Sequence, residues 1–445
     1  YLNKMKNKIL VIGSGAREHA IVRALDRSPQ EKEIYCLASN MNPGIAEHCD
    51  EILIGNFNNP EFVVSYAKEV GATLAIIGPE NPLANGVADA LWEAGVKVVG
   101  PKKDLAQLET SKAFTRDLLK EYDIPGGPQY ETFNSMNGVA DFLNILGENY
   151  VVKYDGLAGG KGVKVSGDHL HSHEEALAYC QELVEGGGKF VIEEKFIGEE
   201  FSLMSFCDGD TLKHMPVVQD HKRAYEGDTG PNTGGMGTYS DANHSLPFMA
   251  DDDITQAHNI NIQTAMAVKD KFGEGYKGIL YGGFMATATG VKLIEYNARF
   301  GDPEAMNVLS LLEADFIDIC NGIADGTLDK VDVRFQNKAT VCKYAVPEGY
   351  PDNPIKGKSV DVSQIENPDG LFYASVDFKG ASLVEAGSRT VAVVGIADTI
   401  SKAEIIAEKE VSSISGPLFH RNDIGTDKLI QKRINHMKEI KCESI

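Results

Sequence analysis

The stretch ILVIGSGAREHAIVRAL, residues 9–25, predicts a buried strand, a glycine turn and the start of a helix. The four apolar residues before Gly13 run without alternation, as in a parallel strand that is covered on both faces. An apolar stripe at helical spacing follows from Ala20 to Ala24. This order of elements is typical of the opening of a doubly wound α/β sheet.

The same turn lacks two parts of a dinucleotide-binding fingerprint. Glu18 stands where the third glycine is needed, and no acidic residue follows the next expected strand, which ends near Ala38. A glycine loop and a helix N-terminus remain, with Arg17 and His19 beside them, and these can hold a phosphate group. We therefore expect a phosphate site here and not an NAD site.

Composition limits the classes of protein that this chain can belong to. Its 445 residues suggest about three domains. The formal net charge of −22 repels nucleic acid, so any phosphate must be bound by a local positive site. The seven cysteines form no CxxC pair, which is typical of reduced cytosolic thiols. The apolar runs predict no membrane span and no signal peptide, so we expect a cytoplasmic protein.

Strands and helices alternate through the first hundred residues, which predicts a doubly wound parallel sheet. The expected strands lie at 8–13, 33–38, 51–55, 73–80 and 96–101. Glycines end two of them, at Gly13 and Gly78, so both ends should meet at the carboxyl edge where such sheets bind ligands. We expect the whole chain to divide into three domains. They are an N-terminal domain at 5–107, a central domain at 108–331 with a smaller subdomain at about 125–196, and a small C-terminal α+β domain at 332–445.

A glycine-rich hairpin, VVKYDGLAGGKGVKV, occupies residues 151–165. Its glycines let the backbone approach a ligand closely. The P-loop pattern fails, because Gly162 stands where Ser or Thr is required and no helix follows. We interpret the segment as a flap that covers phosphates, and the alternative is a flexible hairpin tip.

A second stretch, FVIEEKFIGEEFSL at 190–203, places four carboxylates after an apolar strand. Its backbone can meet the edge of an adenine, and an acid placed just beyond can take ribose hydroxyls. The alternative is a row of solvated acids at a strand edge.

The segment QDHKRAYEGDTGPNTGGMGTYS, residues 219–240, combines charged residues with a run of Gly, Pro, Asn and Thr. This composition predicts neither a helix nor a packed strand. A loop of this length in a compact domain favours a functional role over a disordered surface loop.

The stretch VKLIEYNARFGDPEAMNVL, residues 291–309, contains a strand that should present Glu295, Asn297 and Arg299 on one face. A carboxylate and an amide oxygen are suitable ligands for Mg²⁺, and the arginine can bind a carboxylate or a phosphoryl group. The alternative is an ion pair on an exposed sheet. Residues expected on the opposite face are Ile294, Tyr296 and Ala298. Together, the flap, the nucleotide strand and this acid-amide pair indicate ATP with Mg²⁺.

These segments resemble the ATP-grasp superfamily. More narrowly, GSGAREHA, GPENPL, the 219–240 segment, YNARFGDPE and SGPLFHRNDIG resemble the glycinamide ribonucleotide synthetase family, from about Lys8 to about Gly425. The resemblance implies a pre-ATP-grasp N-terminal sheet, a two-part ATP-grasp domain and a small C-terminal domain. It also implies a ligase of purine biosynthesis that joins glycine to 5-phosphoribosylamine with ATP, through glycyl phosphate.

Residue roles follow from the same resemblance. ATP is expected at Lys112, Lys153, Gly159, Gly160, Lys161, Gly162, Glu193, Glu194, Phe196 and Glu200. Mg²⁺ or Mn²⁺ is expected at Glu295 and Asn297, and catalytic roles at Arg299, Asp220 and Lys222. Substrate binding is expected at Gly15, Glu18, Glu80, Asn232, Thr233, Gly234 and Gly235. The partners are expected to be small molecules only, and the enzyme a monomer.

Two departures from the wider superfamily modify these expectations. Gly283 stands twelve residues before Glu295, where many ATP-grasp enzymes carry another acidic ligand, so a fully acidic two-metal site is not expected. The flap has Tyr154 and Gly159 where alanines are usual, which predicts at most an altered flexibility.

Two other classes of protein remain as alternatives. A related ATP-grasp carboxylase or formyl-transferring ligase would share the ATP site, but the 219–240 segment argues against it. A dinucleotide-dependent oxidoreductase or a nucleotide-sensing protein is favoured only by the opening glycine turn.

Overall fold

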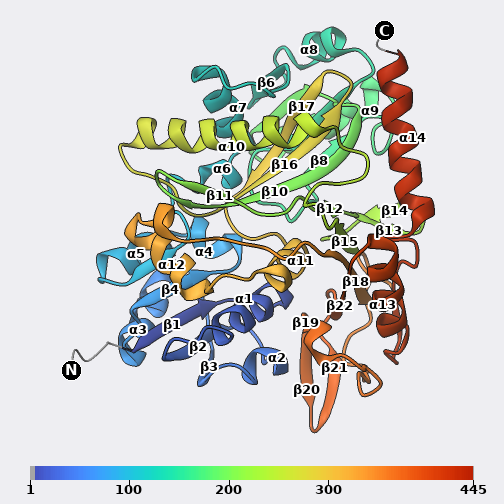
Figure 1. The fold of residues 1–445 in the computed structure, drawn as a ribbon. Coiled ribbons are helices and arrows are strands. Elements are labelled where there is room, and N and C mark those ends of the chain that lie inside the picture. Colours follow the sequence, from blue (N-terminus) through green and yellow to red (C-terminus); the bar gives the residue numbers. More distant parts are fainter. Residues whose placement is uncertain (1–5, 444–445) are drawn as a thin grey trace.

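The computed structural model describes residues 6–443, so the expected outer domain limits at 5 and 445 lie outside the described part. The N-terminal region forms a five-stranded parallel sheet in the order β3-β2-β1-β4-β5 (Figure 1). Its strands are β1 (Asn7–Ile12), β2 (Lys32–Ala38), β3 (Glu51–Ile54), β4 (Leu74–Ile77) and β5 (Lys97–Val99). Its helices are α1 (Ala16–Asp26), α2 (Pro43–Ala46), α3 (Pro60–Val70), α4 (Glu80–Ala84) and α5 (Val87–Glu93). The predicted doubly wound sheet is confirmed.

The carboxyl ends of β1 and β4 meet at one edge of this sheet, as expected. A Cβ atom on either Gly13 or Gly78 would stand 2.6 Å from the side chain of Glu18. Both positions therefore need glycine, because the Glu18 side chain fills the space between the two strand ends.

A smaller subdomain with its own hydrophobic core follows. Its antiparallel sheet has the order β6-β9-β7-β8. The strands are β6 (Tyr130–Phe133), β7 (Tyr150–Tyr154), β8 (Val163–Val165) and β9 (Phe190–Glu194), and α8 (Val139–Leu146) and α9 (His173–Glu185) accompany them. The connecting helices α6 (Gln107–Thr110) and α7 (Lys112–Glu121) precede it. Its core, which includes Phe133, Leu143, Tyr150 and Phe190, is separate from the core shared by the rest of the described chain.

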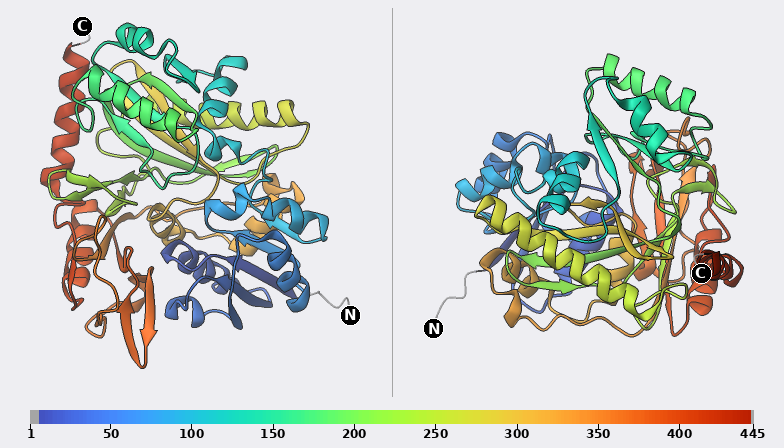
Figure 2. Two further views of the ribbon diagram at one scale, coloured as in Figure 1. Left: turned by 180° about the vertical axis from the view of Figure 1, so that it is seen from behind. Right: turned by 90° about the horizontal axis from the view of Figure 1, so that it is seen from above.

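The larger part of the central domain is a four-stranded antiparallel sheet in the order β11-β10-β16-β17. The long helix α10 runs beside this sheet (Figures 1 and 2). The strands are β10 (Gly198–Asp208), β11 (Leu212–His214), β16 (Lys277–Thr287) and β17 (Gly290–Asn297). The helices are α10 (Asp251–Phe272), α11 (Glu304–Leu311), α12 (Phe316–Asp325) and a 3-10 turn at Leu328–Lys330.

The 219–240 segment is not the irregular loop that its composition predicts. It forms β12 (Gln219–Asp220), β13 (Arg223–Tyr225), β14 (Thr229–Asn232) and β15 (Gly237–Ser240). β13 and β14 make a small hairpin, while β15 is buried and pairs antiparallel with a strand of the C-terminal region. Partners far along the chain satisfy its backbone, and this long-range pairing overrides the weak local propensity.

The C-terminal region adds most of a six-stranded sheet in the order β12-β15-β18-β22-β19, with β23 also paired to β18. Its elements are β18 (Ala339–Pro347), a 3-10 turn at Pro368–Gly370, β19 (Leu371–Tyr373), β20 (Val376–Lys379), β21 (Ser382–Glu385), β22 (Val391–Ala397), α13 (Ile400–Ser412), β23 (Leu418–Phe419) and α14 (Asp427–Glu443). Helix α14, drawn in red, leaves this region and reaches β10 of the central domain (Figure 1). Within residues 6–443, no helix is both long and apolar enough to cross a membrane.

Candidate active site

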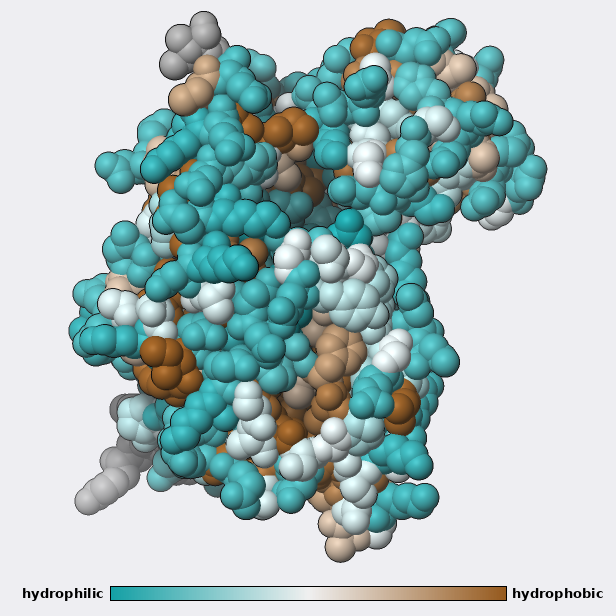
Figure 3. All heavy atoms as spheres, turned by 90° about the vertical axis from the view of Figure 1, so that its right-hand side faces the viewer, coloured by the Kyte–Doolittle hydropathy of each residue, from teal (hydrophilic) through white to brown (hydrophobic). Residues whose placement is uncertain are grey.

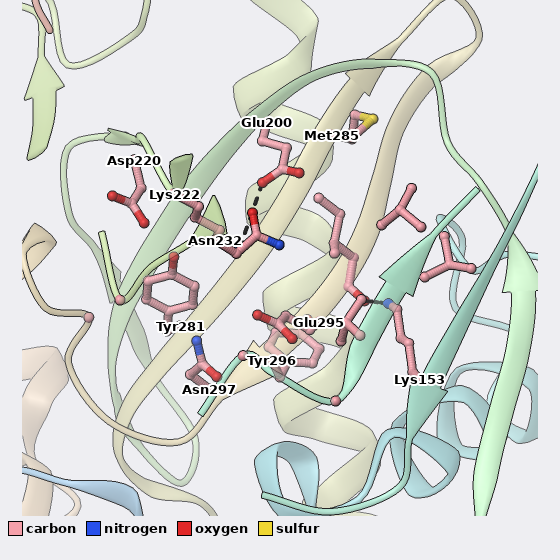
Figure 4. Close-up of a pocket in the computed structure, with 18 of the residues that line it drawn as sticks. Lys153, Glu200, Asp220, Lys222, Asn232, Tyr281, Met285, Glu295, Tyr296 and Asn297 are labelled. Carbon is pink, nitrogen blue, oxygen red and sulfur yellow. Dashed lines mark hydrogen bonds and ion pairs between the residues drawn. The ribbon is translucent and has the colours of Figure 1, made fainter. Parts of the chain in front are cut away.

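A cavity of about 850 Å³ lies where the two parts of the central domain, the N-terminal sheet edge and the C-terminal region converge. The molecular face in Figure 3 is hollowed between its two upper parts. Most of the expected site residues line the cavity, and Figure 4 shows part of this lining. They are Glu80, Lys112, Lys153, Gly159, Gly160, Gly162, Glu193, Glu194, Phe196, Glu200, Asp220, Lys222, Asn232, Thr233, Gly234, Glu295, Asn297 and Arg299.

The base of the flap is fixed to the N-terminus of α7. Asp155, just after β7, accepts hydrogen bonds from Ser111 Oγ and from the Ala113 backbone nitrogen, each at 3.1 Å. Lys112 Nζ donates to the Gly156 carbonyl at 2.8 Å. A carboxylate at a helix N-terminus is favourable, so this contact positions Lys112 at the cavity wall.

The flap turn requires glycine for its backbone conformation and not for space. Gly159 and Gly160 have φ values of +56° and +78°, and nothing lies within 4 Å of a Cβ built at either position. Lys161 beside them is exposed and does not line the cavity.

Glu193 on β9 pairs with two buried cations at the back of the cavity, and its single negative charge leaves this cluster net positive. Arg116 binds its carboxylate through Nε at 2.7 Å and Nη2 at 3.0 Å. Lys153 forms an ion pair with the same carboxylate, and its Nζ donates to the Ile294 carbonyl at 3.1 Å. Burial alone would raise the pKa of Glu193, but Arg116 and Lys153 hold it below its usual range. The Glu193 side chain is therefore part of the framework, and only its backbone remains for a ligand.

Glu200 on β10 points toward Lys222 of the 219–240 segment (Figure 4). Its carboxylate stands 3.8 Å from Lys222 Nζ, and both side chains are about half exposed. Glu200 raises the pKa of Lys222, which therefore remains a cation.

Glu295 and Asn297 present two oxygen donors side by side on β17 (Figure 4). Burial would raise the pKa of Glu295, but Lys222, Lys153 and then Lys112 lower it, so the carboxylate is ionised. The Asn297 amide makes two hydrogen bonds when its nitrogen donates to Glu109 Oε1 and to the Tyr296 carbonyl, at 3.2 Å each. This orientation is the reverse of the one drawn in Figure 4. With the nitrogen turned this way, the amide oxygen is left to bind a cation.

The described residues hold no group of three or more His, Cys, Asp or Glu side chains placed for a metal. A carboxylate and an amide oxygen are compatible with an ion such as Mg²⁺, which takes few protein ligands and fills its other positions with water and phosphate oxygens.

The expected alternation along β17 is wrong at one residue. The register with β16 shifts between Gly283 and Phe284, so Glu295 pairs with Gly283 while Leu293 pairs with Phe284. Ile294 is the extra residue, and it lines the cavity. Tyr296 also borders the cavity, but its hydroxyl donates to Thr264 on α10, so its ring points away as expected. A bulge of this kind re-aims neighbouring side chains, which period-two counting does not foresee.

Arg299 lies beyond the end of β17 and joins the central domain to the N-terminal sheet edge. Its Nη2 is 2.9 Å from Glu109 Oε1, and its Nε is 3.4 Å from Glu80 Oε2. The two carboxylates raise the pKa of Arg299 against its burial, so the guanidinium is a permanent charge at this wall.

Three expected substrate residues do not line the cavity. Glu18 Oε1 accepts a hydrogen bond from the Gly15 backbone nitrogen at 3.0 Å, and Glu18 Oε2 binds Arg17 Nε at 2.5 Å. Gly15 and Glu18 thus cap α1, and it is Arg17 that reaches the cavity. Gly235 lies behind Gly234, against the Asp220 side chain.

Arg389 between β21 and β22 is a cavity residue that sequence reasoning missed. Its Nη1 donates to the carbonyls of Gly234, Gly235 and Asp302, at 2.9, 3.1 and 3.1 Å, and its Nη2 is 3.3 Å from Asp302 Oδ1. No local motif marks this arginine. Asp302 and Glu304 also line the cavity and stand inside the quoted GDPE motif, so that motif could have suggested them.

Comparison with known proteins places this site in a family. Profiles of the phosphoribosylglycinamide synthetase N domain, ATP-grasp (A) domain and C domain match residues 7–109, 110–305 and 340–427. The phosphoribosylamine–glycine ligase of Methanosarcina barkeri is 53% identical over 434 residues, covering 98% of this chain and 100% of that protein. The ligase of the same name from Methanocaldococcus jannaschii is 51% identical over 444 residues, with coverage of 98% and 100%.

Solved structures give the same result. The crystal structure of phosphoribosylamine–glycine ligase from Thermotoga maritima is 27% identical with a TM-score of 0.80, and the match covers 94% of this chain and 100% of that one. A biotin carboxylase domain from Hydrogenobacter thermophilus, at 16% identity and a TM-score of 0.72 over 98% of this chain and 94% of that one, shares the fold alone. The sheet order, the composite cavity and these matches together show that the chain belongs to the phosphoribosylglycinamide synthetase family of ATP-grasp ligases.

Proposed function

We propose that this chain joins glycine to 5-phosphoribosylamine, converts ATP to ADP and phosphate, and forms glycinamide ribonucleotide by way of glycyl phosphate in purine biosynthesis. One observation carries the proposal. A single cavity runs from the flap and the 193–196 segment at the end of β9, past Glu295 and Asn297, to the wall formed by Lys222 and Arg299. The cavity can therefore hold a nucleotide, its metal-bound phosphates and the acyl acceptor next to one another.

The first step places a carboxylate oxygen of glycine against the terminal phosphorus of ATP, and ADP is the leaving group. The glycine carboxylate and the phosphate are both anionic, so their approach requires fixed positive charge. Lys112 and Lys153 supply it from the flap side, and Arg299 from the opposite wall. These groups are already held by backbone carbonyls and carboxylates, so little reorganisation is needed when charge develops.

We propose Mg²⁺ or Mn²⁺ at Glu295 and Asn297. The ion supplies charge neutralisation on the transferred phosphoryl group when bound. The chain's own part is to present one ionised carboxylate and one amide oxygen to it, which the surrounding lysines favour by keeping Glu295 deprotonated.

Isotope transfer provides the direct test. Glycine labelled with ¹⁸O in its carboxylate, incubated with ATP and 5-phosphoribosylamine, is expected to deliver one labelled oxygen to the inorganic phosphate. Release of ADP is expected to require glycine. Unlabelled phosphate would contradict a glycyl phosphate intermediate, and ADP release without glycine would contradict the ligase assignment.

A metal-site variant tests the residues. Glu295→Ala is expected to abolish turnover at millimolar Mg²⁺ while the unfolding transition remains cooperative. Glu131→Ala, an exposed change on β6, serves as the matched control. Wild-type turnover in Glu295→Ala would remove Glu295 from the mechanism.

The remaining expectations are part of the same proposal. The enzyme is a monomer in the cytoplasm and acts on small molecules only. Its domain limits lie near residues 107 and 331, and its residues have the roles given above. Light scattering of the purified chain tests the oligomeric state.

A further inference from the structure

Two carboxyl groups from distant parts of the chain line the same end of the cavity as Arg389, near enough to interact electrostatically. Asp220 closes β12, and Glu304 opens α11. A Cβ atom built on Gly235 would stand 2.8 Å from Asp220 Oδ1 and 2.9 Å from Pro303 Cδ. The Asp220 carboxyl therefore lies next to the residue that precedes Glu304, and glycine at 235 leaves the room for this.

Glu304 is 2% exposed, and only one of its two carboxyl oxygens has a hydrogen-bond partner among residues 6–443. Its Oε1 accepts a hydrogen bond from the Tyr281 hydroxyl at 3.1 Å. Its Oε2 is buried and has no hydrogen-bond partner within residues 6–443. A Cβ on Gly301 would stand 2.1 Å from that same oxygen, so the backbone makes room for it. Leaving a carboxyl oxygen buried and unpaired is costly, which points to a partner supplied by a ligand in the cavity.

The surroundings keep this pair from being fully ionised. Burial and then the neighbouring Glu304 raise the pKa of Asp220 well above its usual value, against the opposing charge of Lys222. Burial also raises the pKa of Glu304, against Arg299. Repulsion between two neighbouring carboxylates favours one proton held between them, and the carboxylate that remains ionised can then accept a further proton.

The other ionisable groups at this end of the cavity are already engaged. Lys222, Arg299 and Arg389 are cations and cannot accept a proton. Asp302 accepts from the Tyr344 hydroxyl at 2.6 Å and pairs with Arg389, while Glu80 pairs with Arg299.

His221 follows Asp220 in the chain but is a poor proton acceptor. Burial and the nearby Arg433 and Arg421 lower its pKa to about 3. Its Nδ1 lies 3.0 Å from the Gly237 carbonyl, and its ring packs 5.8 Å from that of Tyr239.

Bond formation in the second step of the proposed reaction releases a proton. The amine nitrogen of 5-phosphoribosylamine forms a C–N bond to the acyl carbon, the bond from that carbon to the phosphate oxygen breaks, and phosphate leaves with the electron pair. The nitrogen must lose one proton as it becomes an amide. We propose that the Asp220–Glu304 pair accepts this proton, with Glu304 Oε2 as the receiving atom. This inference rests on the proposed ligase reaction.

Glu304→Gln separates this role from binding, because glutamine keeps an oxygen for Tyr281 but cannot take the proton. Glycyl phosphate is trapped in parallel with hydroxylamine, whose weakly basic nitrogen loses its proton to water. The variant is expected to form glycine hydroxamate near the wild-type rate while amide formation with 5-phosphoribosylamine falls about 10²- to 10⁴-fold. Glu410→Gln, a buried change on α13, is the control and should leave both rates unchanged.

Several results would overturn the inference. Equal loss of hydroxamate and amide, or a raised KM for glycine with kcat unchanged, would show that Glu304 binds glycine instead. If Glu304→Gln does not fold, Asp220→Asn must show the same selective loss of amide formation, and an unselective loss would exclude the pair. Wild-type enzyme that forms neither product would refute the proposed function and not this step alone.

Discussion

Arg433 on α14 donates to Asp228 in the β13–β14 turn, with Nη1 2.5 Å from Oδ2 and Nη2 3.1 Å from Oδ1. The Nε of the same guanidinium is 3.6 Å from Glu199 Oε2 at the start of β10. Glu199 directly precedes Glu200, the expected ribose ligand. One arginine of the last helix thus joins the segment that bears Lys222 to the strand that bears Glu200.

Arg433→Ala should remove the contacts of this arginine with both Asp228 and Glu199. Asp228 keeps Arg421 at 3.2 Å, so the loss is partial, and we expect the free energy of unfolding to fall by about 1–3 kcal/mol. The KM for ATP should rise severalfold, because the Glu199–Glu200 turn and the 219–240 segment lose a shared partner. Urea unfolding and steady-state kinetics measure the two effects, with the exposed Lys438→Ala on α14 as control. Unchanged stability and KM would show that α14 is only appended to the surface.

Arg389→Lys is expected to impair the substrate end of the cavity selectively. A lysine ammonium cannot reproduce the planar fork that contacts three carbonyls and Asp302, nor the guanidinium placed 4.5 Å from the Tyr344 ring centroid. The kcat/KM for 5-phosphoribosylamine should fall roughly tenfold or more, which corresponds to about 1.4 kcal/mol, while the KM for ATP changes little. Arg334→Lys, on an exposed ion pair with Asp332, is the matched control. An equal loss for ATP and 5-phosphoribosylamine would argue for a general structural role.

Local patterns predict the N-terminal sheet and the flap because each of these elements is specified by residues close in sequence. The unbroken apolar run before Gly13 and the hairpin around Gly159 need no information from elsewhere. The same holds for Glu295 and Asn297, which share a face because they lie two residues apart on one strand.

The parts that could not be predicted depend on partners far along the chain. β15 is a strand because β18, a hundred residues later, pairs with it. Arg389 reaches the cavity only through the fold of the C-terminal region. The resemblance implies substrate binding at Glu18, but it does not indicate that this side chain fills the space between Gly13 and Gly78, which depends on how β1 and β4 lie together.

Glu193→Gln tests the buried charge cluster behind the cavity. The substitution leaves Arg116 and Lys153, which are both nearly inaccessible, without their anion. Breaking a buried ion pair from one side costs about 3–5 kcal/mol, and we expect a loss of this size in urea unfolding. Glu131→Gln on the adjacent β6 keeps the same chemical change at an exposed position and should cost little. A loss below 1 kcal/mol would mean that the two cations find other partners.

Glu385 at the end of β21 makes stability depend on pH in the direction opposite to that of a paired carboxylate. Its side chain is 1% exposed, and neither carboxyl oxygen has a hydrogen-bond partner within the described chain. Burial and then Glu348 raise its pKa to about 7. The folded protein therefore favours the protonated form, so this contribution to stability is complete below about pH 4.5 and is lost as the pH rises through 7.

Glu385→Gln should consequently be more stable than the wild type at pH 8, by at most about 3 kcal/mol. The difference should shrink toward zero near pH 4.5, because protonated glutamate and glutamine are then both neutral. Urea unfolding of both proteins at several pH values between 4.5 and 8 measures this difference, and Glu131→Gln controls for loss of a surface charge. A variant that is less stable than the wild type at pH 8 would show that the Glu385 carboxylate is stabilised when ionised, which requires a partner that moves toward it.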